Sequence, residues 1–504
     1  MAVVIAIDAG TTGVRAIAFD RSGRAVASSY REFTQYFPRP GWVEHDAIEI
    51  WEAVQEVLGN LAAQLAEQRS ADVVAIGITN QRETVVVWDR RTGEPRHRAI
   101  VWQDRRTAGT CDALRETGHL DLIRRKTGLV LDPYFSATKL GWLFTHGGVE
   151  PSAGTVFGTV DSWVLWNLTG GAVHATDPSN ASRTLLYDIG SLAWDGDLCA
   201  LFGVPEHVLP EVHPSSGRFG VTVEGVAGFG AGIPVSGIAG DQQAALFGQA
   251  CFEPGMTKNT YGTGSFVLMN VGPSCPEPVE GLLTTVAWTI PATGSGASGE
   301  LVTHYALEGA IFVTGAAVQW LRDGLGIIDS AAEIGPLAET VPDTGGVVLV
   351  PAFTGLGSPW WDPYARGTIV GITRGTTRAH LARAVVEAMA YQTRDVVEAM
   401  SAAAGSRIKG LRVDGGASVM PLLLQVQADQ LGCEVSRPVV GETTALGAAY
   451  LAGLAEGFWD SLEDISDNWA LDISMRPASD PANADRLYGQ WRRAVDRARA
   501  WAAE

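Results

Sequence analysis

The sequence predicts an α/β protein made of two similar halves. Segments with the apolar pattern of strands interleave with segments of helical periodicity along the whole chain. A hairpin with a turn rich in glycine and threonine opens the chain, and a second such hairpin follows a Pro-Gly break at residues 254–255. We therefore expect a distant internal repeat, with one domain over residues 1–250 and another over residues 251–504.

The first half opens with a predicted β-hairpin. The apolar run Val4–Ile7 is followed by the turn Asp8–Gly13 and by a second apolar run, Val14–Phe19, as is typical of strands bounded by turn residues. The remaining segments of this half continue the alternation. Strands are predicted at Val73–Ile78, Val85–Trp88, Ala99–Trp102 and Val235–Ala239, and helices at Ile48–Gln68, Tyr134–Phe144, Ser162–Leu168 and Gln242–Gln249.

The second half repeats the opening and then continues with longer helices. Strands Thr257–Tyr261 and Phe266–Asn270 flank the turn Gly262–Ser265. A polar surface segment, Ser474–Asp485, precedes a final helix that runs to Glu504. Further strands are predicted at Gly346–Pro351 and Gly410–Asp414, and helices at Ala306–Leu325, Arg378–Ala404 and Pro421–Leu431.

Composition and charge limit the classes of protein to which the chain can belong. Its 504 residues are 46% hydrophobic and include 16 Trp, which excludes a disordered chain and supplies more than one core. With 37 Lys and Arg against 56 Asp and Glu, the formal net charge is −19. Such a charge repels nucleic acids and anionic membranes, so we expect neither as a partner. A phosphate-bearing ligand would need a local site of backbone N–H groups and a metal ion.

Cysteine usage and hydropathy predict the compartment. The five cysteines are widely spaced and form no C-x-x-C pair, which favours a reducing, cytoplasmic location. The apolar opening lacks a basic leader, and no uncharged apolar run approaches the roughly 18 residues of a transmembrane helix. We therefore expect neither a signal peptide nor a membrane span.

The two Gly/Thr turns, Gly10–Gly13 and Gly262–Ser265, are candidate phosphate sites. Successive backbone N–H groups in a glycine-permitted turn, joined by threonine hydroxyls, form an anion-binding concavity. If the halves face each other, each turn can hold one end of a polyphosphate, with Asp8 holding a hydrated Mg²⁺ between them. Hairpin turns without a ligand are the alternative. The sequence contains neither a P-loop motif nor the spacing of a dinucleotide fingerprint.

Asp241 is the candidate general base. It lies where the predicted strand Val235–Ala239 gives way to a predicted helix. Ligands of open α/β sheets collect at the carboxyl ends of strands, and a carboxylate there can accept the proton of a hydroxyl that attacks a γ-phosphate. The alternative role is an ordinary helix N-cap.

Two polar segments, Asn80–Thr84 and Val101–Arg106, combine charged and amide groups with an aromatic side chain. Carboxylate and amide acceptors with guanidinium donors can satisfy the vicinal hydroxyls of a small polyol, and Trp102 can cover its C–H face. A solvated loop salt bridge with a core tryptophan is an equally simple interpretation.

A series of strings in order along the chain resembles the FGGY family of carbohydrate kinases, glycerol kinases among them. The resemblance runs from Ile5 to about Gly457 and implies two actin-like (ribonuclease H-like) domains with an active-site cleft between them. It also implies transfer of the γ-phosphoryl group of ATP to glycerol. The strings include FPRPGWVEHD (37–46), ITNQRET (78–84), VWQDRR (101–106), SGIAGDQQAALFGQ (236–249), KNTYGTGSF (258–266), ALEGAIF (306–312), VDGG (413–416) and ETTALGAAYLAG (442–453).

The resemblance also implies roles for individual residues, carried over by matching position. Asp241 would be the general base, and Asp8 would hold Mg²⁺ through water. Glycerol would be surrounded by Arg82, Glu83, Trp102, Tyr134, Asp241, Gln242 and Phe266. The nucleotide would be bound by Thr11, Thr12, Gly13, Arg15, Thr263, Gly315, Gln319, Gly416 and Met420. From the residues alone, Tyr134 and Phe266 would be core aromatics, Gly315 a packing residue and Gln319 a solvated amide.

The sequence departs from the family pattern at several positions. Ala9 and Gly13-Val14 stand where glycerol kinases usually have Gln and paired Ser, which removes hydroxyl donors to phosphate but leaves the backbone N–H groups. Met420 replaces an Asn on the adenine side, which predicts looser nucleotide affinity or base selectivity. Gly232 replaces an Arg associated with feedback by a sugar bisphosphate in some relatives, so we expect no such regulation.

The sequence thus predicts a kinase that uses ATP and Mg²⁺ to form sn-glycerol 3-phosphate and that assembles as a dimer or tetramer. Two alternatives remain open. A family member acting on erythritol, threitol, xylulose or ribulose is suggested by Ala9 and Gly13-Val14, which are more typical of sugar kinases. An inactive nucleotide-binding regulator is disfavoured by the intact Asp8 and Asp241.

Overall fold

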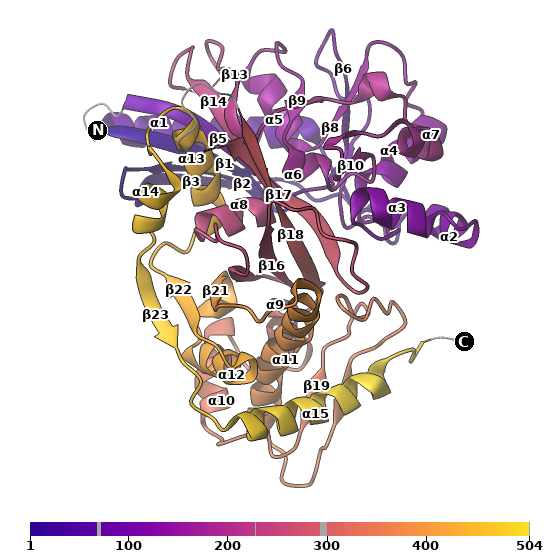
Figure 1. Cartoon of the computed structure of the whole chain (residues 1–504), viewed down its shortest axis with the longest axis vertical. Helices are drawn as coiled ribbons and strands as arrows, with labels where there is room; N and C mark the ends of the chain where they lie inside the picture. Colours follow the sequence, from indigo (N-terminus) through magenta and orange to yellow (C-terminus); the bar gives the residue numbers. More distant parts are fainter. Residues whose placement is uncertain (68–71, 227, 293–299, 503–504) are drawn as a thin grey trace.

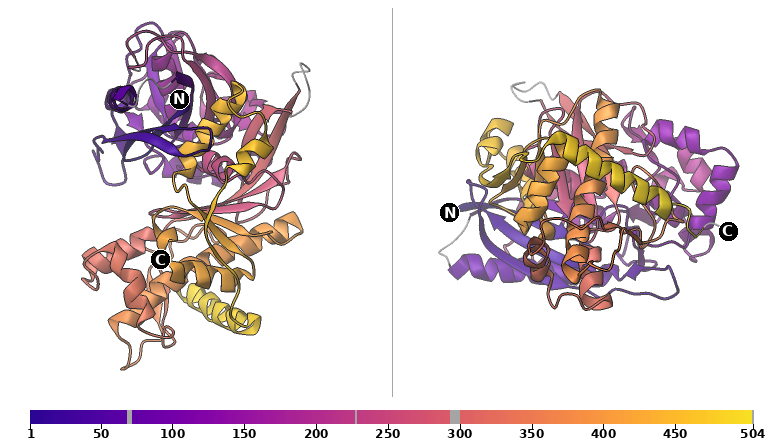
Figure 2. Two further views of the ribbon diagram at one scale, coloured as in Figure 1. Left: turned by 90° about the vertical axis from the view of Figure 1, so that its left-hand side faces the viewer. Right: turned by 90° about the horizontal axis from the view of Figure 1, so that it is seen from below.

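Two β-sheets with their helices are stacked along the long axis of the molecule (Figures 1 and 2). The structure, a computed structural model, describes residues 1–67, 72–226, 228–292 and 300–502. The glycine-rich segment 225–232 therefore includes one position, 227, that lies outside the described residues. Among the described helices, none is long and apolar enough to cross a bilayer.

The first sheet has the strand order β13-β14-β5-β1-β2-β3. The predicted hairpin is formed by β1 and β2, which pair antiparallel, whereas β5 runs parallel to both β1 and β14. Residues 3–7 of β1 are fully buried, because helices cover both faces of the sheet. The strands are β1 (Ala2–Ala9), β2 (Gly13–Phe19), β3 (Ala25–Glu32), β5 (Asp72–Asn80), β13 (Ser216–Val221) and β14 (Pro234–Gly240).

The second sheet has the strand order β17-β18-β16-β15-β21-β22-β23. It also opens with an antiparallel hairpin, β15 with β16, and β21 runs parallel to both β15 and β22. The strands are β15 (Thr257–Tyr261), β16 (Ser265–Gly272), β17 (Leu283–Pro291), β18 (Leu301–Ile311), β21 (Leu411–Asp414), β22 (Val435–Pro438) and β23 (Leu471–Met475).

The two sheets share one topology, which confirms the predicted repeat. The order β3-β2-β1-β5-β14 of the first half corresponds to β18-β16-β15-β21-β22 of the second, with the same strand directions. This is the actin-like, ribonuclease H-like arrangement. The helices at equivalent places are α1 (Ala47–Glu67) and α11 (Arg378–Ala404), α5 (Val160–Leu168) and α12 (Pro421–Leu431), and α8 (Asp241–Gly248) and α13 (Thr443–Ala455).

Helices α8 and α13 cross closely between the halves. A Cβ on Gly447 would lie 1.8 Å from the carbonyl oxygen of Ala244, and one on Gly248 would lie 2.0 Å from that of Thr443. Only glycine permits this approach. Although α13 belongs to the second half in sequence, it packs on β1, β5 and β14 of the first sheet (Figure 1).

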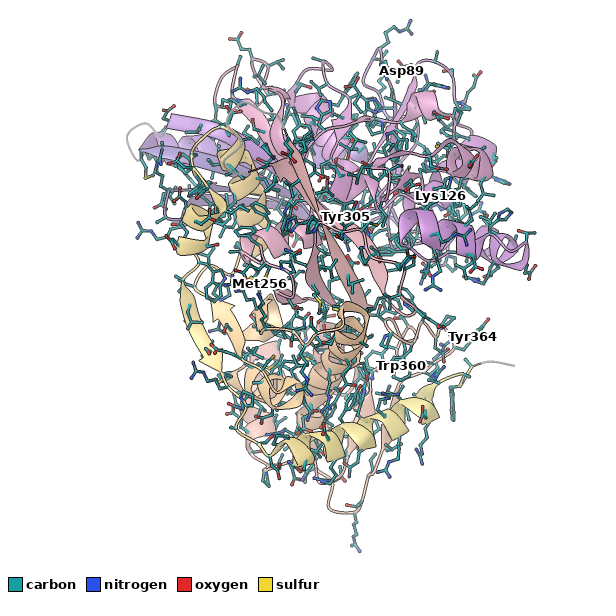
Figure 3. All side chains as sticks on the ribbon, viewed as in Figure 1. Asp89, Lys126, Met256, Tyr305, Trp360 and Tyr364 are labelled. Atoms are coloured by element: carbon teal, nitrogen blue, oxygen red, sulfur yellow. The ribbon has the colours of Figure 1, made fainter. Side chains whose placement is uncertain are left out.

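Strands β17 and β18 also reach from the second half to the first. The hydroxyl of Tyr305, on β18 near the middle of the molecule (Figure 3), donates to the carbonyl oxygen of Ile189 at 2.8 Å. The N–H of Thr284, on β17, donates to the carbonyl oxygen of Gly128 at 2.9 Å. The halves are therefore interlocked by elements of both.

One predicted element is wrong. Ala306–Leu325 was expected to be a single helix, but residues up to Ile311 belong to strand β18, and helix begins only with α9 (Gly315–Gln319). The cause is burial: every residue of Ala306–Ile311 is buried, and a continuous apolar run does not distinguish a buried strand from a helix. The predicted surface segment Ser474–Asp485 also includes the end of β23 and the start of α15 (Pro481–Ala498).

The remaining predicted elements are present, several of them with shifted ends. Helices α11 and α12 begin and end at the predicted residues, whereas the helix expected at Tyr134–Phe144 is α4 (Ser136–Thr145). The other elements are β4 (Glu44–His45), β6 (Val86–Asp89), β7 (Ala99–Ile100), α2 (Ala108–Glu116), α3 (Leu120–Thr127), β8 (Thr155–Gly158), β9 (Ala175–Thr176), α6 (Pro178–Ala181), β10 (Tyr187–Asp188), β11 (Ala193–Trp194), α7 (Gly196–Phe202), β12 (Glu211–Val212), α10 (Ile334–Glu339), β19 (Val348–Val350), β20 (Thr368–Val370) and α14 (Leu462–Asp467).

Candidate active site

The carboxyl ends of three parallel strands meet at one edge of the first sheet. Asn80 at the end of β5 lies opposite Ala9 of β1 and opposite Gly240 of β14. The first Gly/Thr turn, the segment Asn80–Thr84 and Asp241 therefore leave the sheet side by side. Three motifs that are distant in sequence are brought to the edge where α/β proteins bind their ligands.

Three polar side chains hold the first Gly/Thr turn. Gln81 Nε2 donates to the carbonyl oxygen of Gly10 at 3.0 Å, and Gln35 Nε2 donates to that of Thr11 at 2.9 Å. The ring of His45 lies between the two amides, 2.6 Å from Gln35 Oε1 and 3.3 Å from Gln81 Nε2. Burial lowers the pKa of His45 to about 4, so the ring is neutral at pH 7 and can serve one amide as donor and the other as acceptor.

Asp8 and Arg15 face each other across the β1–β2 hairpin at the base of this turn. Burial and then the negative charge of Asp241 raise the pKa of Asp8 to about 7, while Arg15 opposes the shift. Arg15 forms an ion pair with Glu442, which immediately precedes α13. The turn itself is open to solvent at Thr12, whose Oγ1 lies 3.4 Å from Tyr30 Oη. This edge of the first half thus contacts the second half.

The surroundings of Asp8 fit a hydrated magnesium ion. Over the described ranges, no group of three or more His, Cys, Asp and Glu residues could hold a metal. Mg²⁺ usually keeps several waters and binds one or two carboxylates together with the phosphates of a substrate. Asp8 supplies such a carboxylate beside a candidate phosphate turn. Burial is the main cause of its raised pKa, and the negative charge of Asp241, which a cation would offset, adds to it.

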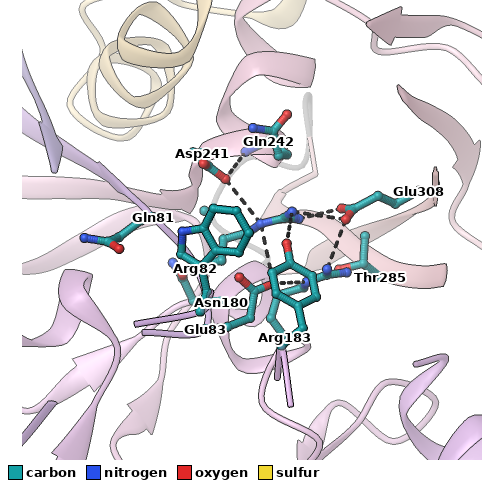
Figure 4. A network of polar contacts seen from close by, with 12 residues as sticks. Gln81, Arg82, Glu83, Asn180, Arg183, Asp241, Gln242, Thr285 and Glu308 are labelled. Atoms are coloured by element: carbon teal, nitrogen blue, oxygen red, sulfur yellow. Dashed lines mark hydrogen bonds and ion pairs between the residues drawn. The ribbon is translucent and has the colours of Figure 1, made fainter. Parts of the chain in front are cut away.

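Arg82 is the centre of a buried polar cluster (Figure 4). It donates from Nη1 to Gln243 Oε1 and from Nη2 to Tyr134 Oη, each at 3.2 Å. Its Nε lies 3.2 Å from Asp241 Oδ1. Its guanidinium carbon lies 5.7 Å from the ring centre of Phe266, on β16 of the second sheet. Arg82 therefore links candidate polyol residues from both halves.

Trp102 connects this cluster to the first Gly/Thr turn. Its ring packs edge-on against Tyr134 with centroids 5.5 Å apart, and its Nε1 donates to Thr11 Oγ1 at 3.0 Å. Trp102, Tyr134 and Phe266 are each only partly buried, unlike a core aromatic such as Trp88, which has no exposed surface. All three can therefore present an aromatic face to a ligand.

Two charged residues that sequence reasoning missed complete the cluster. Glu308, on β18, accepts from Arg82 at 2.5 and 3.0 Å and from Arg183 Nη2 at 3.0 Å. Arg183 Nε donates to Glu83 Oε1 at 2.8 Å, and that oxygen lies 3.7 Å from Arg82 Nε. We call Arg82, Glu308, Arg183 and Glu83 the four-charge ring; none of its side chains is more than 1% exposed.

The arginines of the four-charge ring determine the ionisation of Glu308. Burial alone would raise the pKa of Glu308, but Arg183 and Arg82 outweigh it and lower the pKa to about 2. For Glu83, burial is the larger effect, and its pKa is raised despite the same two arginines. The backbone of Glu83 has a φ of 54°, which is uncommon for a residue other than glycine. The only sequence signal for Glu308 was the string ALEGAIF.

Asp241 is the first residue of α8 and does not cap it. Gly240 occupies the N-cap position, and the helix has no side-chain cap. The Asp241 carboxylate is 31% exposed and faces Arg82; its Oδ1 also accepts from the N–H of Gln242 at 2.7 Å. The N-cap alternative is therefore wrong, and the carboxylate is available at the carboxyl end of β14.

Gln242 is held from the second half by Lys258 of β15, which was not among the candidate residues. Lys258 Nζ donates to Gln242 Oε1 at 2.5 Å and to Thr260 Oγ1 at 2.9 Å. Burial lowers the pKa of Lys258 to about 8, while Asp414 and then Asp241 oppose this shift. Because Lys258 holds the side-chain oxygen of Gln242, the side-chain NH₂ group of Gln242 points away from Lys258.

The second Gly/Thr turn packs against the start of α9. The N–H of Gly315 donates to the carbonyl oxygen of Gly262 at 3.0 Å, and that of Thr314 donates to the carbonyl oxygen of Thr263 at 3.0 Å. A Cβ on Gly315 would lie 2.6 Å from the oxygen of Gly262, so this approach needs glycine. Thr263 itself is exposed and can contact a ligand.

The other nucleotide candidates group with the second turn rather than with Arg82. Gly416 follows the end of β21, which runs parallel to β15 with Asp414 opposite Thr260. Met420 follows one short turn later, at the N-cap of α12. Gln319 is exposed at the end of α9, the helix that Gly315 begins. Two groups of candidates are thus present, one at the strand ends of each sheet.

A pair of actin-like domains with a polyol-type cluster and two Gly/Thr turns is the architecture of a carbohydrate kinase. Residues 3–248 match the model for the N-terminal domain of the FGGY family of carbohydrate kinases, and residues 257–456 match the model for its C-terminal domain. The chain belongs to the FGGY family of carbohydrate kinases.

Similar proteins match the chain over almost its whole length. Glycerol kinase 2 of Thermotoga maritima is 55% identical over 505 residues, and the match covers 99% of each chain. Glycerol kinase of Symbiobacterium thermophilum is 56% identical over 509 residues, with the same coverage. The crystal structure of Plasmodium falciparum glycerol kinase with ADP has a TM-score of 0.92 at 35% identity, covering 99% of this chain and 98% of that one.

Proposed function

We propose that the chain transfers the γ-phosphoryl group of ATP to a terminal hydroxyl of glycerol, which gives sn-glycerol 3-phosphate. The observation that carries this proposal is Asp241, a partly exposed carboxylate 3.2 Å from Arg82 Nε at the carboxyl end of β14. Full-length similarity to proteins named glycerol kinase supports glycerol as the substrate.

Asp241 is the general base of the proposed reaction. As the terminal hydroxyl oxygen attacks the γ-phosphorus, its proton passes to the Asp241 carboxylate. A bond forms between that oxygen and phosphorus, and the bond from phosphorus to the β,γ-bridging oxygen breaks, so that ADP leaves. Arg82 and the N–H of Gln242 both contact Oδ1, which leaves Oδ2 for the substrate.

The polyol is held by the cluster around Arg82. Gln242 donates to hydroxyl oxygens, Glu83 accepts from hydroxyl groups, and Trp102 and Phe266 cover the C–H surface. Arg82 lines the site with its N–H groups on protein acceptors and orients Asp241. Tyr134 completes this set. Because polar groups left unpaired in a buried site are costly, the cluster favours a ligand with a hydroxyl on each carbon.

The nucleotide is bound between the two Gly/Thr turns. Residues 1–250 supply most of the polyol site and the first turn, with Thr11, Thr12, Gly13 and Arg15, and residues 251–504 supply the second turn and the nucleotide site. Asp8 would hold a magnesium ion through water, and that ion would offset negative charge on the phosphates. In the second domain the nucleotide residues are Thr263, Gly315, Gln319, Gly416 and Met420.

A substrate panel tests this function. ADP formation by the purified chain is measured with glycerol, dihydroxyacetone, erythritol, threitol, xylulose and ribulose, each with ATP and Mg²⁺. We expect kcat/KM for glycerol to exceed that for each longer polyol or ketose by about 10-fold or more. Glycerol as a poor substrate would overturn the proposal.

Two alternatives are separated by the same panel. A kinase for a longer polyol or a ketose is favoured by Ala9 and Gly13-Val14 in the first turn, and it would prefer one of the other compounds. An inactive nucleotide-binding regulator would consume no ATP in a polyol-dependent way. The presence of both Asp8 and Asp241 is the argument against the regulator.

Three further expectations stay predictions. They are a cytoplasmic location, a dimeric or tetrameric state, and the absence of feedback by a sugar bisphosphate, because Gly232 stands where some relatives have Arg. Looser nucleotide selectivity at Met420 is measurable as the ratio of kcat/KM for ATP to that for GTP.

A further inference from the structure

We propose that Glu308 is a positioning residue for phosphoryl transfer: it holds both terminal nitrogens of Arg82 and so leaves Asp241 free to accept the substrate proton. The inference rests on the proposed function, which does not use Glu308. It gives a role to the string ALEGAIF, which contains Glu308.

The argument starts from the hydrogen bonds of the Arg82 guanidinium. An arginine has four N–H groups on its terminal nitrogens and one on Nε. Glu308 accepts from Nη1 at 2.5 Å and from Nη2 at 3.0 Å, Gln243 accepts from Nη1, and Tyr134 accepts from Nη2. The four terminal N–H groups are therefore assigned. Only the Nε edge faces Asp241, at 3.2 Å (Figure 4).

Asp241 can act as the base only if Arg82 leaves one of its two carboxylate oxygens unpaired. If the fork of the guanidinium paired with Asp241 through two N–H groups, both carboxylate oxygens would be occupied. With Glu308 on the fork, the contact of Arg82 with Asp241 runs from Nε to Oδ1 at 3.2 Å. The second oxygen can then receive a hydrogen bond from the attacking hydroxyl and afterwards its proton.

The charge balance of the four-charge ring supports the same conclusion. Glu308 and Glu83 compensate Arg82 and Arg183, so the ring is neutral without Asp241. Without the Glu308 charge, two guanidinium groups that are at most 1% exposed would face one carboxylate. Asp241 is the next carboxylate within reach of Arg82, and an unpaired buried charge is costly. Arg82 would therefore turn its fork toward Asp241.

Glu308 is held rigidly, although it comes from the second half of the chain. It pairs with Leu268 of β16 on one side of β18 and with Leu283 of β17 on the other. Strand β17 is in turn tied to α8, because Gln243 Nε2 donates to Thr285 Oγ1 at 3.0 Å. The Glu308 carboxylate is thus fixed relative to the helix that begins with Asp241.

The test uses three variants of the full chain. Glu308→Gln removes the charge at constant size, and Glu308→Asp keeps the charge on a shorter side chain. Glu387→Gln is the matched control, since Glu387 is also buried and accepts from Arg383 and Tyr391, but in α11, outside the site. Rates are expressed per folded molecule, and a crystal structure of Glu308→Gln is determined.

We expect Glu308→Gln to lower kcat for glycerol about 100-fold, the loss typical of a displaced reacting group. The KM for ATP should change less than about 2-fold, because the nucleotide residues lie elsewhere. Glu308→Asp should recover at least a tenth of the wild-type kcat. In the crystal structure of Glu308→Gln, Arg82 should contact Asp241 through two nitrogens. Glu387→Gln should keep the wild-type constants.

Three results would overturn the inference: wild-type kcat in Glu308→Gln, equal losses in Glu308→Gln and Glu387→Gln, or an Arg82 that keeps its single contact with Asp241. The proposed function fails separately, when the wild-type chain does not phosphorylate glycerol. In that case the crystal structure still decides whether Glu308 controls the orientation of Arg82.

Discussion

Asp241 has to be held in place and yet remain reactive. A carboxylate paired through both oxygens is a poor proton acceptor, and one that nothing holds is poorly placed. In this chain one oxygen is fixed by Arg82 Nε and by the N–H of Gln242, while the side chain stays 31% exposed. The site thus orients the carboxylate through one atom and leaves the other for chemistry.

Asp241→Asn tests the assignment of the base. Asparagine keeps the size and one acceptor oxygen but cannot take the proton. We expect kcat to fall about 100- to 10,000-fold, which is the usual contribution of a general base. Glycerol binding, measured by calorimetry, should be partly retained because Arg82 and Glu83 remain. A variant with near-normal turnover would contradict the assignment.

His45 makes the stability of the first Gly/Thr turn depend on pH. Its pKa of about 4 in the fold, lowered by burial, is below the ordinary value of 6.5. As the pH falls, the unfolded chain therefore binds the proton before the folded chain does. The contribution of neutral His45 to the free energy of unfolding is complete above pH 6.5 and is lost as the pH falls toward 4. The full loss corresponds to about 3 kcal/mol.

The measurement is the free energy of unfolding in urea between pH 7.5 and pH 4.5. His45→Gln should show a shallower decline with falling pH than the wild type. His146→Gln, which changes an exposed histidine, should follow the wild-type curve. Parallel curves for His45→Gln and the wild type would contradict the prediction.

Candidate residues could be predicted from the sequence where a charged side chain lies at or next to the end of a predicted strand. Asp8, Arg82 and Asp241 each follow or end a strand, and parallel pairing brings them together. The sequence did not predict Glu308 or Arg183, because their role depends on a partner contributed by a distant element. An isolated charge in an apolar run, such as Glu308, has no local pattern that reveals its partner.

The close crossing of α8 and α13 joins the two halves. A Cβ on Gly447 would overlap the backbone of α8, since it would lie 1.8 Å from the carbonyl oxygen of Ala244. The overlap involves main-chain atoms, so no side-chain rotation relieves it. The helices must move apart, and the helix that begins with Asp241 moves with them.

Gly447→Ala should therefore destabilise the chain by about 1–3 kcal/mol, the usual cost of overpacking a core. Gly59→Ala is the matched control. It also lies within a helix, α1, but a Cβ there meets nothing within 4 Å, so alanine should stabilise by about 0.5–1 kcal/mol. Urea unfolding measures both, and equal effects of the two substitutions would contradict the crossing.

Most helices and strands could be predicted because their periodicity and caps are local. Helix α11 lies between Thr377 and Gly405, a glycine with positive φ, and both are ordinary terminal signals. Strand β18 could not be predicted, because neighbouring strands and covering layers bury all of Ala306–Ile311. A strand that is buried on both faces lacks the alternation of apolar and polar residues by which a strand is identified in a sequence.

The two halves of the sequence are not two separable bodies. Helix α13 contributes Ala445, Ala448 and Leu451 to an apolar cluster that also contains Val4 and Ala75 of the first sheet. Strands β17 and β18 contact the first half through Thr284 and Tyr305. The candidate active site depends on this interlocking, because Glu308, Phe266 and Lys258 of the second half lie beside residues of the first sheet.

Such interlocking predicts one cooperative unfolding transition for a chain of two domains. Domains joined by a small polar interface usually unfold separately, whereas here removal of either half exposes the core of the other. In differential scanning calorimetry the full chain should show a single peak whose calorimetric and van't Hoff enthalpies agree.

A fragment of residues 1–250 lacks α13, so it should bind the dye ANS and lack the near-ultraviolet circular dichroism of packed aromatics. Co-expression with residues 251–504 should restore both properties. Two resolved peaks, or a fragment that is natively packed by itself, would mean that the interface stabilises less than the buried cluster implies.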